Sequence, residues 1–370
     1  MNHAPTAVFR TDASVDIGIG HVMRCLTLAD ALRAQGARCR FVCRLVPGHQ
    51  IDTINARGFP VTALPAVAPA PGTDGGLAHA TWLAGDWQDD AQRMVAALGG
   101  SVIDLLVVDH YALDARWEAA LRPHTRLLLA IDDLADRHHA ADLLLDQNLG
   151  RQAADYTPWL GPAATLLTGP RYALLRPEFQ AWRDRSLARR ATAPVRRLLV
   201  TMGGIDQHNL TGGVLRALAA CNLPAALAVD VVLGSAAPWL DDVRQCCARA
   251  PWPGRLHIDH RDMAALMAAC DLAIGAAGAT SWERCCLGLP TLMVAIAANQ
   301  HPIAQALAHA GAGCNLQADA ARDSAQLGAA LQAMTAADHL QRAGRAASAL
   351  VDGLGTMRVC DALLTRMEAA

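Results

Sequence analysis

The sequence predicts an α/β protein with two doubly wound domains, each built around a parallel sheet. Short apolar runs alternate with amphipathic stretches along the chain, which is typical of βαβ units. The 370 residues exceed one domain of roughly 100–200 residues, so two domains are expected. Hydrophobic residues make up 53% of the chain and charged residues 18%, which predicts packed cores rather than disorder.

Apolar runs bounded by turn residues predict the strands of both sheets. In the first half these are residues 7–9, 39–43, 61–64, 105–108, 126–131 and 142–145. In the second half they are residues 197–202, 228–232, 256–258, 272–274 and 291–294. The carboxyl ends of parallel strands carry the ligand loops, so we expect the loops of both domains to face a shared cleft.

Two segments between the strands predict connections. Residues 179–195 are polar, rich in arginine and closed by Pro194, which predicts a linker between the domains. Residues 67–76 are rich in Pro, Ala and Gly, which predicts a surface loop. The expected organisation is an N-terminal domain over residues 1–180, a C-terminal domain over residues 195–350, and a terminal helix over residues 351–370 that packs back on the first domain.

Composition narrows the classes of partner. The net charge of -2 gives no concentrated positive charge for nucleic acid or a membrane surface, so we expect a small-molecule partner. A monomer is the separate expectation for the oligomeric state. The chain has no lysine, which excludes a Schiff base or a lysine-bearing phosphate loop. Eleven cysteines without a CxxC pair and an N-terminus without a signal peptide predict a reduced, cytoplasmic protein. No metal site and no cofactor are expected.

The first candidate motif follows the opening strand and begins a helix. Arg10 and Asp12 come directly after the strand, and Gly18, Gly20 and His21 lead into the helix. Glycines permit a tight turn, and the positive end of a helix disfavours an imidazolium, so His21 is expected to be neutral and able to accept a proton. The alternative is an ordinary strand-to-helix turn with a capping or surface histidine.

Two further glycine motifs follow strands of the second half. Gly203 and Gly204 follow residues 197–202 and predict a phosphate-sized nest, or else a plain turn. After residues 272–274 come small residues and then a helix, and this segment contains Gly278, Thr280, Ser281 and Glu283. Its hydroxyls could contact phosphate and Glu283 a ribose diol, or these residues could simply stabilise the helix.

Polar residues after two other strands are weaker candidates. Asp109, His110 and Tyr111 follow residues 105–108, and the pair Asp132-Asp133 follows residues 126–131. Such positions suit ligands, but for Asp132 a capping role is favoured, and the pair makes no convincing metal site. His138 and His139 are interpreted as a solvated helix start, and the tryptophans at 82, 87 and 117 as packing residues.

Taken in order, these motifs resemble one enzyme family. They are RTD at 10–12, GIGHVMR at 18–24, VDHY at 108–111, IDD at 131–133, YALLRPEF at 172–179, GGID at 203–206, and GATSWE at 278–283 with Asn299-Gln300. The sequence is similar in these motifs to the UDP-2,4-diacetamido-2,4,6-trideoxy-β-L-altropyranose hydrolases of pseudaminic acid biosynthesis. The similarity runs from about residue 9 to about residue 311.

The resemblance implies a GT-B fold, with two Rossmann-like domains facing a cleft, in which the N-terminal domain (1–180) is the sugar and catalytic domain and the C-terminal domain (195–350) binds UDP. It also implies a metal-independent hydrolysis that releases UDP with inversion. It implies that His21 activates the water, while Asp12, Asp109 and Tyr111 hold the sugar. The candidate residues are His21 as the catalytic group and, as substrate-binding residues, Arg10, Asp12, Gly20, Asp109, Tyr111, Gly203, Gly204, Gly278, Thr280, Ser281, Glu283 and Asn299.

Two other functions fit the same sequence. A GT-B glycosyltransferase would use the same UDP-sugar with an acceptor hydroxyl in place of water, because fold alone does not fix function. A non-catalytic nucleotide-sugar binding module would need no activated histidine.

Overall fold

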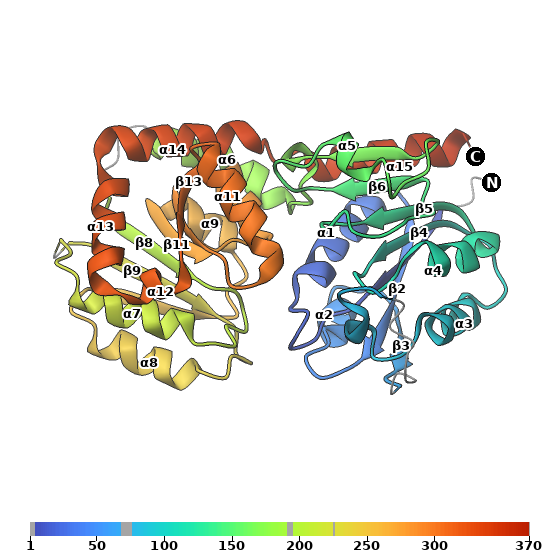
Figure 1. Cartoon of the computed structure of the whole chain (residues 1–370), viewed down its shortest axis with the longest axis horizontal. Coiled ribbons are helices and arrows are strands. Elements are labelled where there is room, and N and C mark those ends of the chain that lie inside the picture. The colour runs from blue at the N-terminus through green and yellow to red at the C-terminus, as the bar shows by residue number, and fades with distance from the viewer. Residues whose placement is uncertain (1–3, 68–75, 191–194, 225, 370) are drawn as a thin grey trace. The chain divides into compact units, whose positions relative to one another are not determined.

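The computed structural model describes residues 4–67, 76–190, 195–224 and 226–369, so most of the predicted loop at 67–76 lies outside the described residues. The chain forms two compact units, and each is described by itself. The first unit comprises Met1–Leu174 and Gly355–Ala370, and the second comprises Leu175–Leu354. The chain thus leaves the first unit after Leu174 and returns to it at Gly355 (Figure 1).

The first unit contains a seven-stranded parallel sheet of order β3-β2-β1-β4-β5-β6-β7. Its strands are β1 (Thr6–Thr11), β2 (Arg38–Leu45), β3 (Val61–Pro65), β4 (Ile103–Asp109), β5 (Thr125–Ile131), β6 (Leu143–Asp146) and β7 (Thr165–Thr168). Its helices are α1 (Gly20–Ala34), α2 (Ile51–Ala56), η1 (Ala80–Leu83), α3 (Trp87–Leu98), α4 (Ala115–Leu121), η2 (Arg122–His124), α5 (Ala153–Tyr156), η3 (Pro170–Tyr172) and α15 (Gly355–Ala369).

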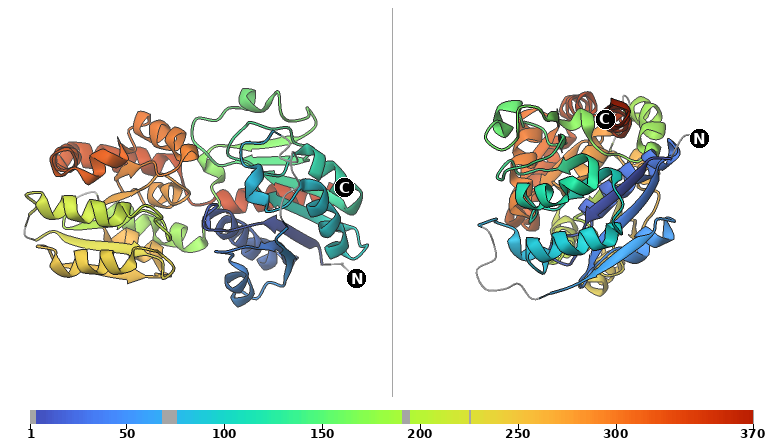
Figure 2. Two further views of the ribbon diagram at one scale, coloured as in Figure 1. Left: turned by 60° about the horizontal axis from the view of Figure 1, so that its bottom comes forward. Right: turned by 90° about the vertical axis from the view of Figure 1, so that its right-hand side faces the viewer.

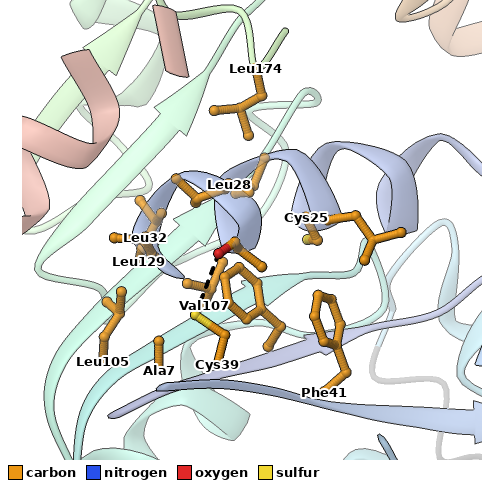
Figure 3. Packing of buried hydrophobic residues seen from close by; sticks show 14 of the residues in the cluster. Ala7, Cys25, Leu28, Leu32, Cys39, Phe41, Leu105, Val107, Leu129 and Leu174 are labelled. Carbon is orange, nitrogen blue, oxygen red and sulfur yellow. Dashed lines mark hydrogen bonds between the residues drawn. The ribbon is translucent and has the colours of Figure 1, made fainter. Parts of the chain in front are cut away.

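Helix α1 covers one face of this sheet (Figure 3). Its residues Leu28 and Leu32 are fully buried in one cluster with strand residues that include Val107 and Leu129. The thiol of Cys39 donates to the carbonyl of Ala29 across 3.6 Å, which ties β2 to α1. The packing fixes the start of α1 relative to the strand ends beside it.

The last helix of the chain belongs to the same core. Val359, Cys360 and Leu363 of α15 are buried in the cluster that contains Leu28 of α1. Figures 1 and 2 place α15, coloured red, within the first unit. This segment returns from the second unit and completes the apolar layer over α1.

The second unit contains a six-stranded parallel sheet of order β10-β9-β8-β11-β12-β13. Its strands are β8 (Arg197–Thr201), β9 (Ala228–Leu233), β10 (Gly254–Ile258), β11 (Leu272–Ala276), β12 (Thr291–Val294) and β13 (Gly313–Leu316). Its helices are α6 (Pro177–Arg190), α7 (Leu210–Ala220), α8 (Leu240–Arg249), α9 (Met263–Ala269), α10 (Thr280–Cys286), η4 (Ala298–Gln300), α11 (His301–His309), α12 (Ala318–Arg322), α13 (Ser324–Thr335) and α14 (Ala337–Leu350).

The predicted fold class is confirmed. Both sheets are parallel, and both follow the order in which the first strand of the unit lies beside the fourth. Each predicted strand is present, whereas β7 and β13 were not predicted. These two are four-residue edge strands that are mostly half-buried, so they lack the continuous apolar run of a central strand.

The prediction of a linker at 179–195 is wrong for its described part. Residues Pro177–Arg190 form helix α6, which belongs to the second unit, and the units divide after Leu174 rather than near residue 180. The arginines of α6 donate to carbonyls at the ends of other helices, as Arg190 does to Met267 of α9 and to Leu287 after α10. Such carbonyls have no partner within their own helix, which explains why a helix needs so many arginines here.

We expect Arg183→Ala to destabilise the second unit by about 1–3 kcal/mol. The Arg183 guanidinium donates to the carbonyls of Cys286, Ser348 and Val351, so its loss leaves several half-buried acceptors without a partner. Urea denaturation measures the change, and Arg185→Ala on the exposed side of α6 is the matched control. Equal stability of the two variants would contradict a capping role for Arg183.

The interpretation of His139 as part of a solvated helix start is also wrong. The side chain is buried, and its Nδ1 lies 2.8 Å from the Glu118 carboxylate. Glu118 also accepts from the backbone N–H of Ala140 and is itself fully buried. A buried carboxylate needs such hydrogen-bond donors. The carboxylate belongs to Glu118 of α4, which is distant in sequence from His139. Local sequence could not reveal it.

Candidate functional site

The N-terminal candidate residues lie at or near the ends of β1 and β4, where the strand order of the first sheet reverses. Strands β1 and β4 are parallel neighbours, and Thr11 pairs with Asp109 at their carboxyl ends. After β1 the chain turns through Gly18, whose φ of 75° lies in the left-handed region that favours glycine, and then enters α1. Ligands of doubly wound sheets bind at this point of the fold.

His21 and Asp109 form a dyad at this position. The Nδ1 atom of His21 lies 2.6 Å from Oδ1 of Asp109. Because a carboxylate only accepts, Nδ1 carries the proton and donates it, which leaves Nε2 with its lone pair free. His21 lies in the first turn of α1 and is 8% exposed. The arrangement is that of a general base whose ring is oriented by a carboxylate.

Arg24, one turn further along α1, fixes the Asp109 carboxylate. Its Nε lies 2.6 Å from Oδ2 and its Nη2 lies 2.7 Å from Oδ1 of Asp109. Burial would raise the pKa of Asp109, but the charges of Arg24 and His21 outweigh it and hold this pKa well below the usual range. Asp109 is therefore an anion that can orient and stabilise a protonated His21.

Asp133, which follows β5, extends the network to Tyr111. Its Oδ2 lies 2.6 Å from Nη1 of Arg24 and accepts from the Tyr111 hydroxyl at 2.5 Å. Burial and then the charge of Asp133 raise the pKa of Tyr111, so the phenol remains a neutral donor. The Asn148 amide donates to Oδ1 of Asp133 at 3.0 Å. The expected sugar-binding pair Asp109 and Tyr111 is thus held in one bonded group with His21.

Aromatic rings surround the dyad. The His21 ring meets the Tyr111 ring edge to face at 4.6 Å between centroids. Trp82 of η1 stacks on Tyr111 at 5.6 Å, and His79 lies 4.3 Å from Trp82. Trp82 was interpreted as a packing residue, but it is only half-buried and faces the dyad. Aromatic faces of this kind accept the apolar face of a sugar ring.

Arg10 and Asp12 lie in a different, fully buried network. Nη1 of Arg10 is 2.7 Å from Asp12, and its other nitrogens bond to Asp90. Asp12 also accepts from the backbone N–H of Arg44 at 2.6 Å. Neither side chain has surface for a ligand in the structure, which favours a positioning role over sugar contact. Gly20, in contrast, is exposed at the start of α1.

In the second unit, the loop after β8 is shaped by the start of α7. Gly203 has a φ of 94°, and Gly204 accepts from the N–H of Gly234 at 2.8 Å. Asp206 accepts from the backbone N–H groups of Leu210 and Thr211, which satisfies two donors in the first turn of α7. The glycines are partly or fully exposed, whereas Asp206 is buried as a cap.

The loop after β11 lies beside it, because β11 pairs with β8. Gly278 and Thr280 are half-buried, and Ser281 is buried. Glu283 lies 3.7 Å from Arg176, and burial raises its pKa despite the opposing charge of that arginine. Asn299 lies in η4, but it is Gln300 whose amide approaches Gly278, 3.4 Å from where a Cβ would stand. The predicted nucleotide-binding residues therefore gather at the strand reversal of the second sheet.

The described residues contain neither a candidate metal site nor a candidate membrane-spanning helix. No group of three or more His, Cys, Asp or Glu side chains there is placed to hold a metal ion. No helix in that part of the chain is both long and apolar enough to cross a membrane.

We expect Asp146→Asn to reduce the pH dependence of stability. Burial and then the charge of Asp133 raise the pKa of Asp146 to about 7. The native state therefore holds this proton more tightly than the unfolded chain, so the contribution of Asp146 to stability is complete below about pH 4 and is lost as the pH rises through about 7. Urea denaturation measures the free energy of unfolding at about pH 5 and about pH 8. The decrease between these two pH values should be smaller in the variant than in the wild type by about 1–3 kcal/mol.

The exposed Asp184→Asn is the matched control for that experiment. An equal change in stability between the two pH values for the wild type and Asp146→Asn would contradict the raised pKa of Asp146.

Several site residues escaped sequence reasoning. Arg24 was part of a quoted motif without a role, and Asp133 was considered only for capping or metal binding. Their contacts join α1 to the ends of β4 and β5, which no local pattern encodes. The spacing of three residues between His21 and Arg24 was the available signal, since it places both on one face of a helix.

Comparison with known proteins supports the expected resemblance. Residues 255–353 match the glycosyltransferase family 28 C-terminal domain. The chain is 26% identical over 261 residues to the UDP-2,4-diacetamido-2,4,6-trideoxy-β-L-altropyranose hydrolase of Campylobacter jejuni, and this match covers 70% of the chain and 80% of that protein. It is 33% identical over 150 residues to the spore coat polysaccharide biosynthesis protein SpsG of Bacillus subtilis, covering 40% of the chain and 42% of that protein.

Solved structures share the fold. MurG of Acinetobacter baumannii superposes with a TM-score of 0.69 at 17% identity, covering 98% of this chain and 100% of that one. The UDP-GlcNAc 2-epimerase of Neisseria meningitidis superposes with a TM-score of 0.62 at 10% identity, covering 98% of this chain and 100% of that one. The chain therefore has the GT-B fold, and the resemblance to the hydrolase is confirmed.

Proposed function

We propose that this protein is a UDP-sugar-processing enzyme of the GT-B type that hydrolyses UDP-2,4-diacetamido-2,4,6-trideoxy-β-L-altropyranose to UDP and the free sugar in pseudaminic acid biosynthesis. The observation that carries the proposal is the His21–Asp109 contact of 2.6 Å, with Arg24 fixing the carboxylate. The named hydrolase of Campylobacter jejuni supports the substrate.

In the proposed reaction, the free Nε2 of His21 accepts a proton from water while the water oxygen attacks the anomeric carbon. The bond from that carbon to the diphosphate oxygen breaks, UDP leaves with the electron pair, and the configuration inverts. Asp109 stabilises the imidazolium that forms, because its carboxylate remains an anion. General-base assistance of this kind contributes about 10²–10⁴-fold to the rate.

The functional groups of the remaining candidate residues suggest which part of the UDP-sugar each would bind. The half-buried ring of Trp82 would contact the sugar with Tyr111 stacked against it, while the fully buried Asp109 would act through His21. The loops with Gly203, Gly204, Gly278, Thr280 and Ser281 would hold the diphosphate, Glu283 the ribose, and Asn299 a neighbouring part of the nucleotide. Hydroxyl and backbone donors can stabilise a leaving diphosphate without a metal.

The decisive experiment incubates the purified protein with the UDP-sugar in ¹⁸O-labelled water without an acceptor and in the presence of EDTA. We expect equal amounts of UDP and free sugar, with the label in the anomeric hydroxyl and the first-formed anomer inverted. Label found in UDP instead would mean that the phosphorus–oxygen bond breaks, which contradicts the proposal.

A GT-B glycosyltransferase is the second candidate, and the match to the glycosyltransferase family 28 C-terminal domain favours it. It would transfer the sugar from UDP to an acceptor hydroxyl. No turnover in water alone, followed by UDP release when an acceptor is added, would select the transferase.

A further inference from the structure

The second unit contains a buried arginine without a carboxylate partner. Arg284 of α10 is 1% exposed, and within the described part of the chain no Asp or Glu oxygen lies within ion-pair distance of it. Burial lowers the pKa of Arg284 to about 10. Burying a charge without a counter-ion is costly. A buried, unpaired arginine such as Arg284 therefore suggests a site that binds an anion.

The guanidinium lies directly beneath the loop that follows β11. Nη2 donates to the carbonyl of Ala276 at 2.7 Å and to the Ser281 hydroxyl at 3.0 Å, and Nη1 approaches the Thr280 hydroxyl at 3.2 Å. A Cβ on Gly275 would stand only 2.6 Å from Nη1, so glycine is needed there for the guanidinium to fit. Its Nε has no hydrogen-bond partner among the described residues.

These contacts determine what the two hydroxyls can do. A hydroxyl has one proton to donate and two lone pairs, and Arg284 occupies a lone pair on each oxygen. The protons of Thr280 and Ser281 thus remain free to be donated away from the arginine. Thr280 is partly exposed, so its proton can reach a ligand in the loop.

We propose that Arg284 is a positioning residue for a bound diphosphate: it turns the hydroxyl protons of Thr280 and Ser281 toward the anion and supplies the positive charge that the anion balances. This inference rests on the proposed binding of UDP by the loop after β11. A fixed cation and fixed donors lower the cost of placing charge on a leaving diphosphate, because they need no reorganisation when the bond breaks.

The experiment is calorimetric titration of the full-length protein with UDP and with uridine. Arg284→Met is expected to weaken UDP binding by about 10-fold or more and to leave uridine binding unchanged, because only UDP carries the anion. Arg284→Lys, which keeps the charge but loses the fork, should recover part of the affinity. Arg185→Met on the exposed side of α6 is the matched control.

A double-mutant cycle with Thr280→Val tests the coupling. If Arg284 acts through the hydroxyl, the loss of UDP affinity in the double variant is smaller than the sum of the two single losses. Equal losses for UDP and uridine in Arg284→Met, or unchanged UDP affinity, overturn the inference. A wild-type protein that binds no UDP overturns the proposed function as well, which separates the two failures.

Should Arg284→Met fail to fold, Thr280→Val and Thr280→Ser decide the matter. UDP affinity lost with valine and kept with serine supports the oriented hydroxyl. Equal UDP affinity in the two variants overturns it.

Discussion

His21→Ala is expected to lower kcat for UDP-sugar hydrolysis by about 10²–10⁴-fold while UDP affinity changes little. The variant removes Nε2, the proposed acceptor of the proton from water, since Nδ1 is engaged with Asp109. UDP is expected to bind the second unit, which this substitution does not touch. Single-turnover UDP release measures the rate, and calorimetric titration measures the affinity.

His309→Ala, in the exposed last turn of α11, is the matched control and should retain full activity. Unchanged kcat in His21→Ala would refute the proposed mechanism. Parallel losses of kcat and UDP affinity would point instead to a structural role for His21.

Asp109→Asn is expected to lower both stability and kcat. Arg24 would lose a buried charged partner but keep Asp133, so we expect the free energy of unfolding to fall by about 3 kcal/mol. Asparagine has one acceptor oxygen, and we expect this oxygen to accept the hydrogen bonds from Arg24. The NH₂ group of the asparagine would then face Nδ1 of His21 and donate to it. That moves the ring proton to Nε2, so kcat should fall by about 10²-fold or more.

The stability effect has a defined pH dependence. The pKa of Asp109 is lower in the folded protein than in the unfolded chain, so its contribution is complete above the ordinary carboxyl range of about 4 and is lost as the pH falls through the native value. Urea denaturation should therefore show a difference between wild type and variant that is large at about pH 7 and smaller at about pH 3. The exposed Asp16→Asn is the control, and a difference that grows at low pH would contradict this account.

The sequence predicted the elements whose signal is local. Central strands such as β4 and β11 are buried along all or nearly all of their length, and their apolar runs indicate this directly. The edge strands β7 and β13 were missed because they are partly solvated and short. Helix α6 was mistaken for a linker because it is rich in arginine. These arginines donate hydrogen bonds to carbonyls of other helices, and composition alone cannot distinguish such a helix from a solvated segment.

For the candidate site, sequence reasoning located the loops but not the bonds within them. His21, Asp109 and Tyr111 were chosen for their places after strands, and the structure joins them in one group. Arg10 and Asp12 were chosen for the same reason, yet their side chains bond to each other, to Asp90 and to Arg44 rather than to this group. Position at a strand end predicts nearness to a ligand, while the direction of each side chain depends on partners that are distant in sequence, such as Asp90.

The return of α15 makes the first unit discontinuous in sequence. A fragment that stops at Leu174 would leave α1 without the side chains of Val359 and Leu363, and we expect it to be insoluble through the apolar surface that this uncovers. Gly355 lies so close to Ala173 that a Cβ on it would stand 2.4 Å from that carbonyl oxygen. A short peptide joining residue 174 to residue 355 should therefore yield an autonomous domain, in which the dyad can be studied apart from the nucleotide loops.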